Sequence, residues 1–150
     1  MDESQKAVLV CNGFTAEFLL TTLLKDPEES YLDCVITIVF DPQLNQPGIT
    51  SVPSYVSFKD LKRLSEFVIQ QSSETCENRF TYVPMNIGFQ LSLSDPDDVS
   101  VSLQILLNIG FGNEGRRVYA GCESEVDVFE IKKFAATLSE IVDKISSQQL

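Results

Sequence analysis

The chain has 150 residues, of which 43% are hydrophobic and 22% are charged, a composition that excludes disordered, collagen-like and coiled-coil proteins. Eleven basic and 22 acidic residues give a net charge of −11, which repels phosphate backbones and therefore excludes a nucleic-acid partner. Histidine is absent, which excludes histidine-based triads and histidine-ligated zinc. From the length and the charge together we expect one acidic domain over residues 1–150 that binds rather than catalyses.

The N-terminus does not resemble a targeting segment. It begins with acidic residues, and the apolar run Ala7–Cys11 is shorter than the apolar stretch of a secretory signal. No segment approaches the roughly 18 to 20 apolar residues that span a bilayer. We therefore expect a cytoplasmic protein with no membrane partner.

The first half of the chain contains three strand-like segments. The segment Phe14–Leu24 fits the spacing of a strand and of a helix equally well. Cys34–Phe40 is apolar on both faces, which predicts a central strand. Ile49–Val56 reads as a strand that Pro53 interrupts, which places it at an edge or a bulge.

A helix is predicted after this strand. Ser57 and Asp60 match the start of a capped helix, and apolar residues then recur at helical spacing as far as about Gln71.

The second half begins with strands. Arg79–Val83 predicts a short strand, and period-two alternation over Ile87–Ser94 and Val101–Leu107 predicts an antiparallel hairpin. Asp95–Asp98 supplies its turn, and it lacks the glycine and glutamate of a calcium-binding loop, so no metal site is predicted.

A further strand and a helix complete the pattern. The glycine-rich segment 110–115 predicts a turn, followed by a strand over Arg117–Val126. The core face of that strand is predicted to carry Val118, Ala120, Cys122 and Val126. A capped amphipathic helix then covers residues 128–146.

The two predicted helix starts, at Ser57 and Asp127, are 70 residues apart, and similar residues coincide at this offset. The sequence therefore suggests a duplicated β-β-α unit over about 32–71 and 99–146. The alternative is that any two capped amphipathic helices align this well by chance. In either case we expect an α+β fold: one mainly antiparallel sheet with two amphipathic helices packed on one face and a polar opposite face.

Four cysteines lie far apart with no Cys-x-x-Cys pair, so no zinc site is predicted. Cys34 and Cys122 lie in apolar strands, where we expect buried structural thiols rather than a disulfide or a reactive thiol. Cys76 lies in a polar stretch and is expected to be exposed.

Five carboxylates are the candidate partner-binding residues. Glu123, Glu125 and Asp127 alternate along a strand and so project from one face, while Asp97 and Asp98 lie in the hairpin turn. Catalytic carboxylates usually need burial, which this pattern does not indicate. A merely solvated acidic face is the alternative.

The order of elements resembles the WapI-type family of small bacterial immunity proteins, which neutralise toxins of contact-dependent competition systems. The resembling segments are Glu17–Leu19, Leu32–Ile38, Ser57–Leu61, Phe80–Phe89 and the last helix, Asp127–Val142. The resemblance implies an α+β fold without enzymatic activity, and it favours a strand over Phe14–Leu24.

Charge and resemblance together predict an immunity protein that occludes a basic toxin, with no cofactor. The alternative is a structural or self-associating domain whose acidity serves solubility. In that case an edge strand such as Ile49–Val56 could pair between two copies and give a homodimer.

Overall fold

The computed structural model describes residues 4–22, 31–73, 79–84 and 88–148. Within these residues the chain forms nine strands and two α-helices. The elements, in chain order, are β1 (Ser4–Cys11), β2 (Phe14–Thr22), β3 (Tyr31–Phe40), β4 (Ile49–Thr50), β5 (Ser54–Ser57), α1 (Phe58–Ser73), β6 (Phe80–Tyr82), β7 (Phe89–Ser94), β8 (Ser100–Phe111), β9 (Arg117–Asp127) and α2 (Val128–Gln148).

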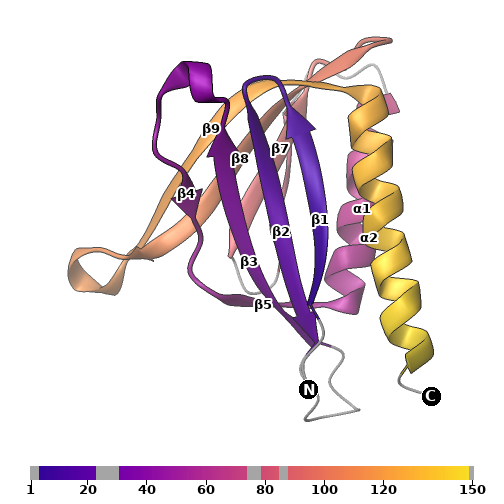
Figure 1. Ribbon diagram of the computed structural model, residues 1–150, viewed down its shortest axis with the longest axis horizontal. Coiled ribbons are helices and arrows are strands. Elements are labelled where there is room, and N and C mark those ends of the chain that lie inside the picture. Colours follow the sequence, from indigo (N-terminus) through magenta and orange to yellow (C-terminus); the bar gives the residue numbers. More distant parts are fainter. Residues whose placement is uncertain (1–3, 23–30, 74–78, 85–87, 149–150) are drawn as a thin grey trace.

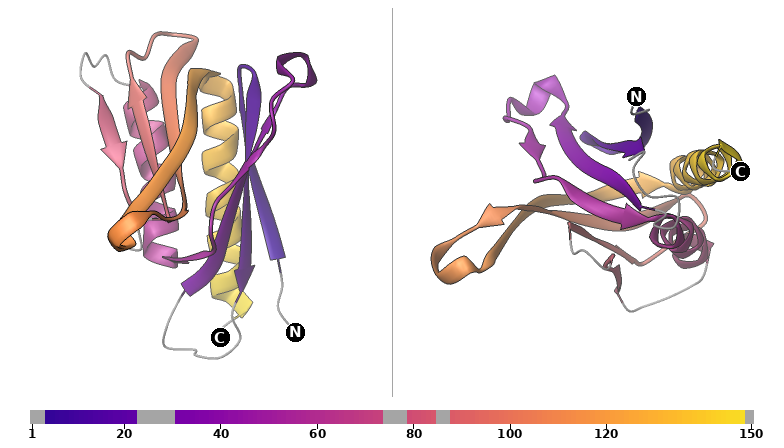
Figure 2. Two further views of the ribbon diagram at one scale, coloured as in Figure 1. Left: turned by 90° about the vertical axis from the view of Figure 1, so that its left-hand side faces the viewer. Right: turned by 90° about the horizontal axis from the view of Figure 1, so that it is seen from below.

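The strands form two antiparallel sheets, and the helices lie side by side along one side of both (Figures 1 and 2). Sheet A has the order β1-β2-β3-β4, with β5 also paired to β3, and sheet B has the order β6-β7-β8-β9. The predicted α+β class with antiparallel strands and two helices is confirmed. The structure differs from the prediction in dividing the strands between two sheets.

A chain of aromatic rings connects the layers in the core. Phe18 of β2 lies 5.4 Å from Phe89 of β7 and 5.1 Å from Phe134 of α2, measured between ring centroids. The ring centroid of Tyr82 of β6 lies 6.2 Å from that of Phe89 and 5.8 Å from that of Phe67 of α1. The buried faces of the two sheets and of the two helices therefore share one interior.

The ambiguous segment Phe14–Leu24 is a strand as far as Thr22, where the described part ends. Four alternating residues, Phe14, Ala16, Phe18 and Leu20, are buried, and β2 pairs with both β1 and β3. The apolar run Ala7–Cys11 forms the C-terminal part of β1. No strand was predicted here, because the run is short.

The predicted central strand and the predicted interrupted strand are both present. β3 pairs with β2 on one side and with β4 and β5 on the other, and the segment around Pro53 separates β4 from β5. In that gap the Val52 N–H donates to the Asn108 carbonyl of β8 at 2.9 Å. This donor is therefore used within the chain and is not available for pairing with a second copy.

The hairpin of β8 and β9 extends beyond the rest of the molecule (Figure 1). The register shifts between Asn108 and Gly110, where Gly110 has a φ of 134°. Beyond this bulge the prediction of a core face fails: Val118 is 41% exposed, because neither sheet A nor a helix covers this end. Ala120 and Cys122 are half-buried, and Val126 is buried as predicted.

Both helices begin where the sequence predicts. At α1 the Ser57 hydroxyl accepts a hydrogen bond from the Asp60 N–H at 2.9 Å, as expected for a capped start. The helices contact one another at Ser65, whose hydroxyl donates to the Ala135 carbonyl at 3.0 Å. These two residues are 70 positions apart, the offset noted in the sequence. The duplication itself stays a prediction.

We predict that Phe18→Ala lowers the free energy of unfolding by about 3–5 kcal/mol, because it empties the site where both sheets meet α2. Chemical denaturation followed by circular dichroism measures this change. Phe129→Ala is the matched control, since Phe129 is 72% exposed and should change stability little. Equal losses for the two variants would contradict a core centred on Phe18.

Candidate functional site

The cysteines do not form a reactive or metal-binding site in the described part of the chain. Cys11 and Cys34 are buried, and burial raises the pKa of both thiols, that of Cys34 to about 12. Cys122 is half-buried rather than buried, and partial burial raises its pKa to about 11. These three thiols are protonated at neutral pH, and the described residues contain no cluster that could hold a metal ion. Cys76 lies outside the described residues.

Asp60 carries a buried carboxylate, and the sequence did not predict its burial. Asp60 is only 4% exposed, and its Oδ2 has no hydrogen-bond partner among the described residues. The neighbouring Tyr82 hydroxyl donates at 2.6 Å to the backbone carbonyl of Asp60 rather than to its carboxylate. Burial raises the pKa of Tyr82, so this phenol is no proton acceptor at neutral pH. The two side chains therefore do not form an acid–base pair.

The structure uses the five predicted partner-binding carboxylates in different ways. The Asp97 carboxylate accepts hydrogen bonds from the N–H groups of Val99 and Ser100, both at 2.7 Å, and so holds the β7–β8 turn. Glu123 forms an ion pair with Arg79. Glu125 is exposed, and its backbone carbonyl accepts a hydrogen bond from the Asn12 N–H at 3.0 Å.

The outer face of sheet B carries the predicted polar side chains. Thr81, Ser92, Gln104 and Glu123 lie directly opposite one another on the four strands, and the first two share a hydroxyl hydrogen bond of 2.8 Å. Arg79 directly precedes β6, and its guanidinium pairs with the Glu123 carboxylate of β9, so the two ends of sheet B are joined by a side-chain contact. Glu123 therefore already has a cationic partner within the chain.

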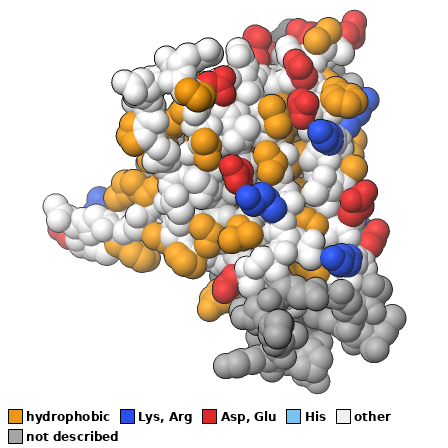
Figure 3. Space-filling model, in the orientation of Figure 1, with side chains coloured by type: hydrophobic (Ala, Val, Ile, Leu, Met, Phe, Trp, Pro, Cys, Tyr) orange, Lys and Arg blue, Asp and Glu red, His pale blue; other side chains and the backbone are white. Residues whose placement is uncertain are grey.

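The other two carboxylates, Asp98 and Asp127, lie beside two exposed hydrophobic residues. Val99 is 68% exposed and Phe129 is 72% exposed, and with Phe111 at the end of β8 they are the most exposed large hydrophobic residues in the described part of the chain. These four residues, with Val128 and Lys132, line an open hollow of about 350 Å³. We call Asp97, Asp98, Val99, Asp127 and Phe129 the acidic corner. In Figure 3 acidic and hydrophobic side chains are interspersed at the upper right, where α2 begins in Figure 1.

Backbone pairing brings the two parts of the acidic corner together. Ser100 at the start of β8 lies opposite Asp127 at the end of β9. The Val128 N–H then donates to the Val99 carbonyl at 2.8 Å, which ties the β7–β8 turn to the first residue of α2. Because the backbone of Val99 is held in this way, its side chain is presented to solvent beside Phe129.

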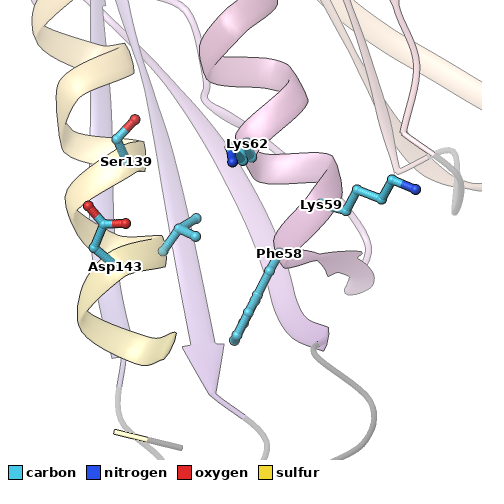
Figure 4. A pocket seen from close by; sticks show the side chains of 6 residues that line it. Phe58, Lys59, Lys62, Ser139 and Asp143 are labelled. Atoms are coloured by element: carbon cyan, nitrogen blue, oxygen red, sulfur yellow. The ribbon is translucent and has the colours of Figure 1, made fainter. Parts of the chain in front are cut away.

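A second hollow, of about 500 Å³, lies between the helices (Figure 4). It is lined by Phe58, Lys59, Lys62, Ser139, Val142 and Asp143, and Lys62 points toward α2 while Lys59 points away from it. Its charged groups are two lysines and one aspartate, so it does not favour a basic partner. The two hollows therefore differ in the balance of charge: two aspartates and Lys132 line the first, whereas two lysines and Asp143 line the second.

Comparison with known proteins gives no matching family model, no similar curated protein and no similar solved structure. The resemblance to the WapI-type immunity proteins therefore stays a prediction. Neither helix in the described part of the chain has the length and apolarity needed to cross a bilayer.

We predict that the charge of Asp97 stabilises the fold in a pH-dependent way. The hydrogen bonds from Ser100 and Val99 hold the pKa of Asp97 below its ordinary value of 3.8. A lowered pKa in the folded state gives stability above the pKa of the unfolded chain, and this stability is lost as the pH falls through the folded value. Asp97→Asn should therefore be less stable than the unaltered chain at pH 6, and this difference should be smaller at pH 3. Urea denaturation at the two pH values measures this, and a difference independent of pH would contradict it.

Proposed function

We propose that this chain is a cytoplasmic, non-catalytic binding protein of the immunity type, and that it occludes a basic protein partner with its acidic corner. The observation that carries the proposal is the exposure of Val99 and Phe129 beside Asp98 and Asp127. Apolar side chains surrounded by carboxylates match a partner surface that combines an apolar contact with lysine or arginine side chains.

Two physical effects contribute to the proposed recognition by the acidic corner. Burial of Phe129 and Val99 removes apolar surface from water and supports affinity, as aromatic side chains often do at the centre of an interface. The carboxylates contribute mainly to the rate of encounter, because a charge of −11 attracts a basic protein over a distance set by ionic strength. A toxin of opposite charge is the kind of partner that benefits from rapid capture.

Hydrogen bonds also hold the acidic corner rigid, which suits a surface that occludes a partner. Asp97 fixes the β7–β8 turn through two backbone hydrogen bonds, and the Val99–Val128 hydrogen bond joins that turn to α2. Little conformational entropy is then lost when the partner binds, which favours affinity.

We predict that the association rate with the basic partner falls at least about tenfold from low to physiological salt. The unaltered chain is used as bait in extracts of cells that encode it, and a secreted toxin encoded beside it is the first candidate to purify. Stopped-flow or surface plasmon resonance then measures association and dissociation rates at several salt concentrations.

Two variants separate the effects of charge and of apolar contact. Asp98→Asn with Asp127→Asn should lower the association rate several-fold, while Phe129→Ala should mainly raise the dissociation rate, by about 10-fold or more. The control is Glu66→Gln with Glu140→Gln, which removes two exposed carboxylates from the helices and leaves the acidic corner intact. An association rate that ignores salt, or equal effects of the two double variants, would contradict the proposed site.

A further inference from the structure

The outer face of sheet A is more apolar than a solvent-exposed sheet face usually is. Outward positions on β1, β2 and β3 hold Val8, Val10, Leu19 and Val39, which are 38–45% exposed. Figure 3 looks onto this face, and hydrophobic side chains are scattered across it. The full set of outward residues is Ser4, Lys6, Val8, Val10, Thr15, Glu17, Leu19, Thr21, Tyr31, Asp33, Val35, Thr37, Val39, Thr50, Tyr55 and Ser57.

The sequence already indicates that this face should be covered. Cys34–Phe40 is apolar on both of its faces, which is typical of a strand buried on both sides. Within one chain only the inner side of β3 is covered, since Cys34, Ile36 and Ile38 are buried while Val39 is 45% exposed. The outer side lacks a covering layer among the described residues.

The charge on this face is nearly balanced although the chain as a whole is strongly acidic. Its charged side chains are Lys6, Glu17 and Asp33, and Lys6 forms an ion pair with Glu17 at 3.0 Å. The other outward residues are aliphatic, tyrosine, serine or threonine. A basic partner gains nothing electrostatically from such a surface, whereas a second copy of the same face can approach it with little local repulsion.

The size and shape of the face suit packing against an identical face. Strands of eight to ten residues, at about 3.3 Å per residue and about 4.8 Å between strands, give roughly 30 Å by 15 Å for β1–β3 alone. With the six residues of β4 and β5 added, the face covers roughly 550 Å² per copy, so two copies together exceed the roughly 1,000 Å² that a specific interface needs. Valine and threonine side chains on a twisted sheet also interlock well with a second sheet at about 10 Å separation.

We propose that two copies of this chain form a symmetric dimer by packing the outer faces of their A sheets against each other. The interface is a sheet-on-sheet contact centred on Leu19 and Val35, which lie opposite each other on β2 and β3. It differs from pairing between edge strands, which the Val52–Asn108 hydrogen bond disfavours at β4. The acidic corner shares no residue with this face, so the dimer can bind two basic partners.

Sedimentation equilibrium over a wide range of chain concentration tests the dimer, with no partner present. The unaltered chain should approach twice the monomer mass as the concentration rises. Leu19→Glu should raise the dissociation constant of the dimer by at least about 100-fold, because the symmetric contact brings two added carboxylates into an apolar interface. In the monomer the new carboxylate lies opposite Lys6, so folding should be preserved.

The matched control is Gln90→Glu, which adds the same charge to the outer face of sheet B and should leave the dimer intact. Val10→Glu, on a different strand of the same face as Leu19, guards against a misfolded first variant, and circular dichroism checks the fold of each. An unaltered chain that stays monomeric at every concentration overturns the proposal, and so does a dimer that both outer-face variants retain. Neither result bears on the basic partner, because that partner is absent from the experiment.

Discussion

The interior that two sheets and two helices share is the constraint on which the rest of the structure depends. Phe18, Phe89 and Phe134 bring sheet A, sheet B and α2 to one point, and Tyr82 continues the contact to Phe67 of α1. Because every inner face is used in this way, the surfaces left for recognition are the outer faces, the loops and the helix ends. Figure 2 shows the two sheets and the two helices from the side and from below.

The surfaces left outside are not alike, and their differences suggest distinct uses. The outer face of sheet B carries polar side chains and the Arg79–Glu123 ion pair, which makes it a poor apolar contact surface. The outer face of sheet A is apolar and nearly neutral, which suits a second copy. The acidic corner combines exposed Phe129 with carboxylates, which suits a basic partner.

Local patterning was enough to predict most of the elements. Alternation over Val101–Leu107 and helical spacing after Ser57 and Asp127 report which side of each element is buried, and the structure confirms these sides. Patterning does not report what lies against a buried side, so the division into two sheets was missed. Val118 shows the same limit, since it continues an apolar pattern at the end of a hairpin that no other described strand or helix covers.

The candidate site was predicted only in part. The hairpin turn drew attention to Asp98 and carboxylate spacing to Asp127, but neither signal could show that Asp97 accepts two backbone hydrogen bonds or that Glu123 pairs with an arginine 44 positions away. The apolar half of the site was missed, although a signal existed. Phe129 is an aromatic residue outside the apolar stripe of α2, which contains Ile131, Phe134 and Leu138, and such a residue faces solvent or a partner.

The most direct test of the acidic corner as the recognition surface is a map of amide chemical-shift changes in the ¹⁵N-labelled chain when the captured basic protein is added. We expect the largest changes in the β7–β8 turn and at the start of α2, around Val99 and Phe129, with the strands of sheet A little affected. Changes concentrated on β1, β2 and β3, with the acidic corner unperturbed, would contradict the assignment of partner binding to this corner.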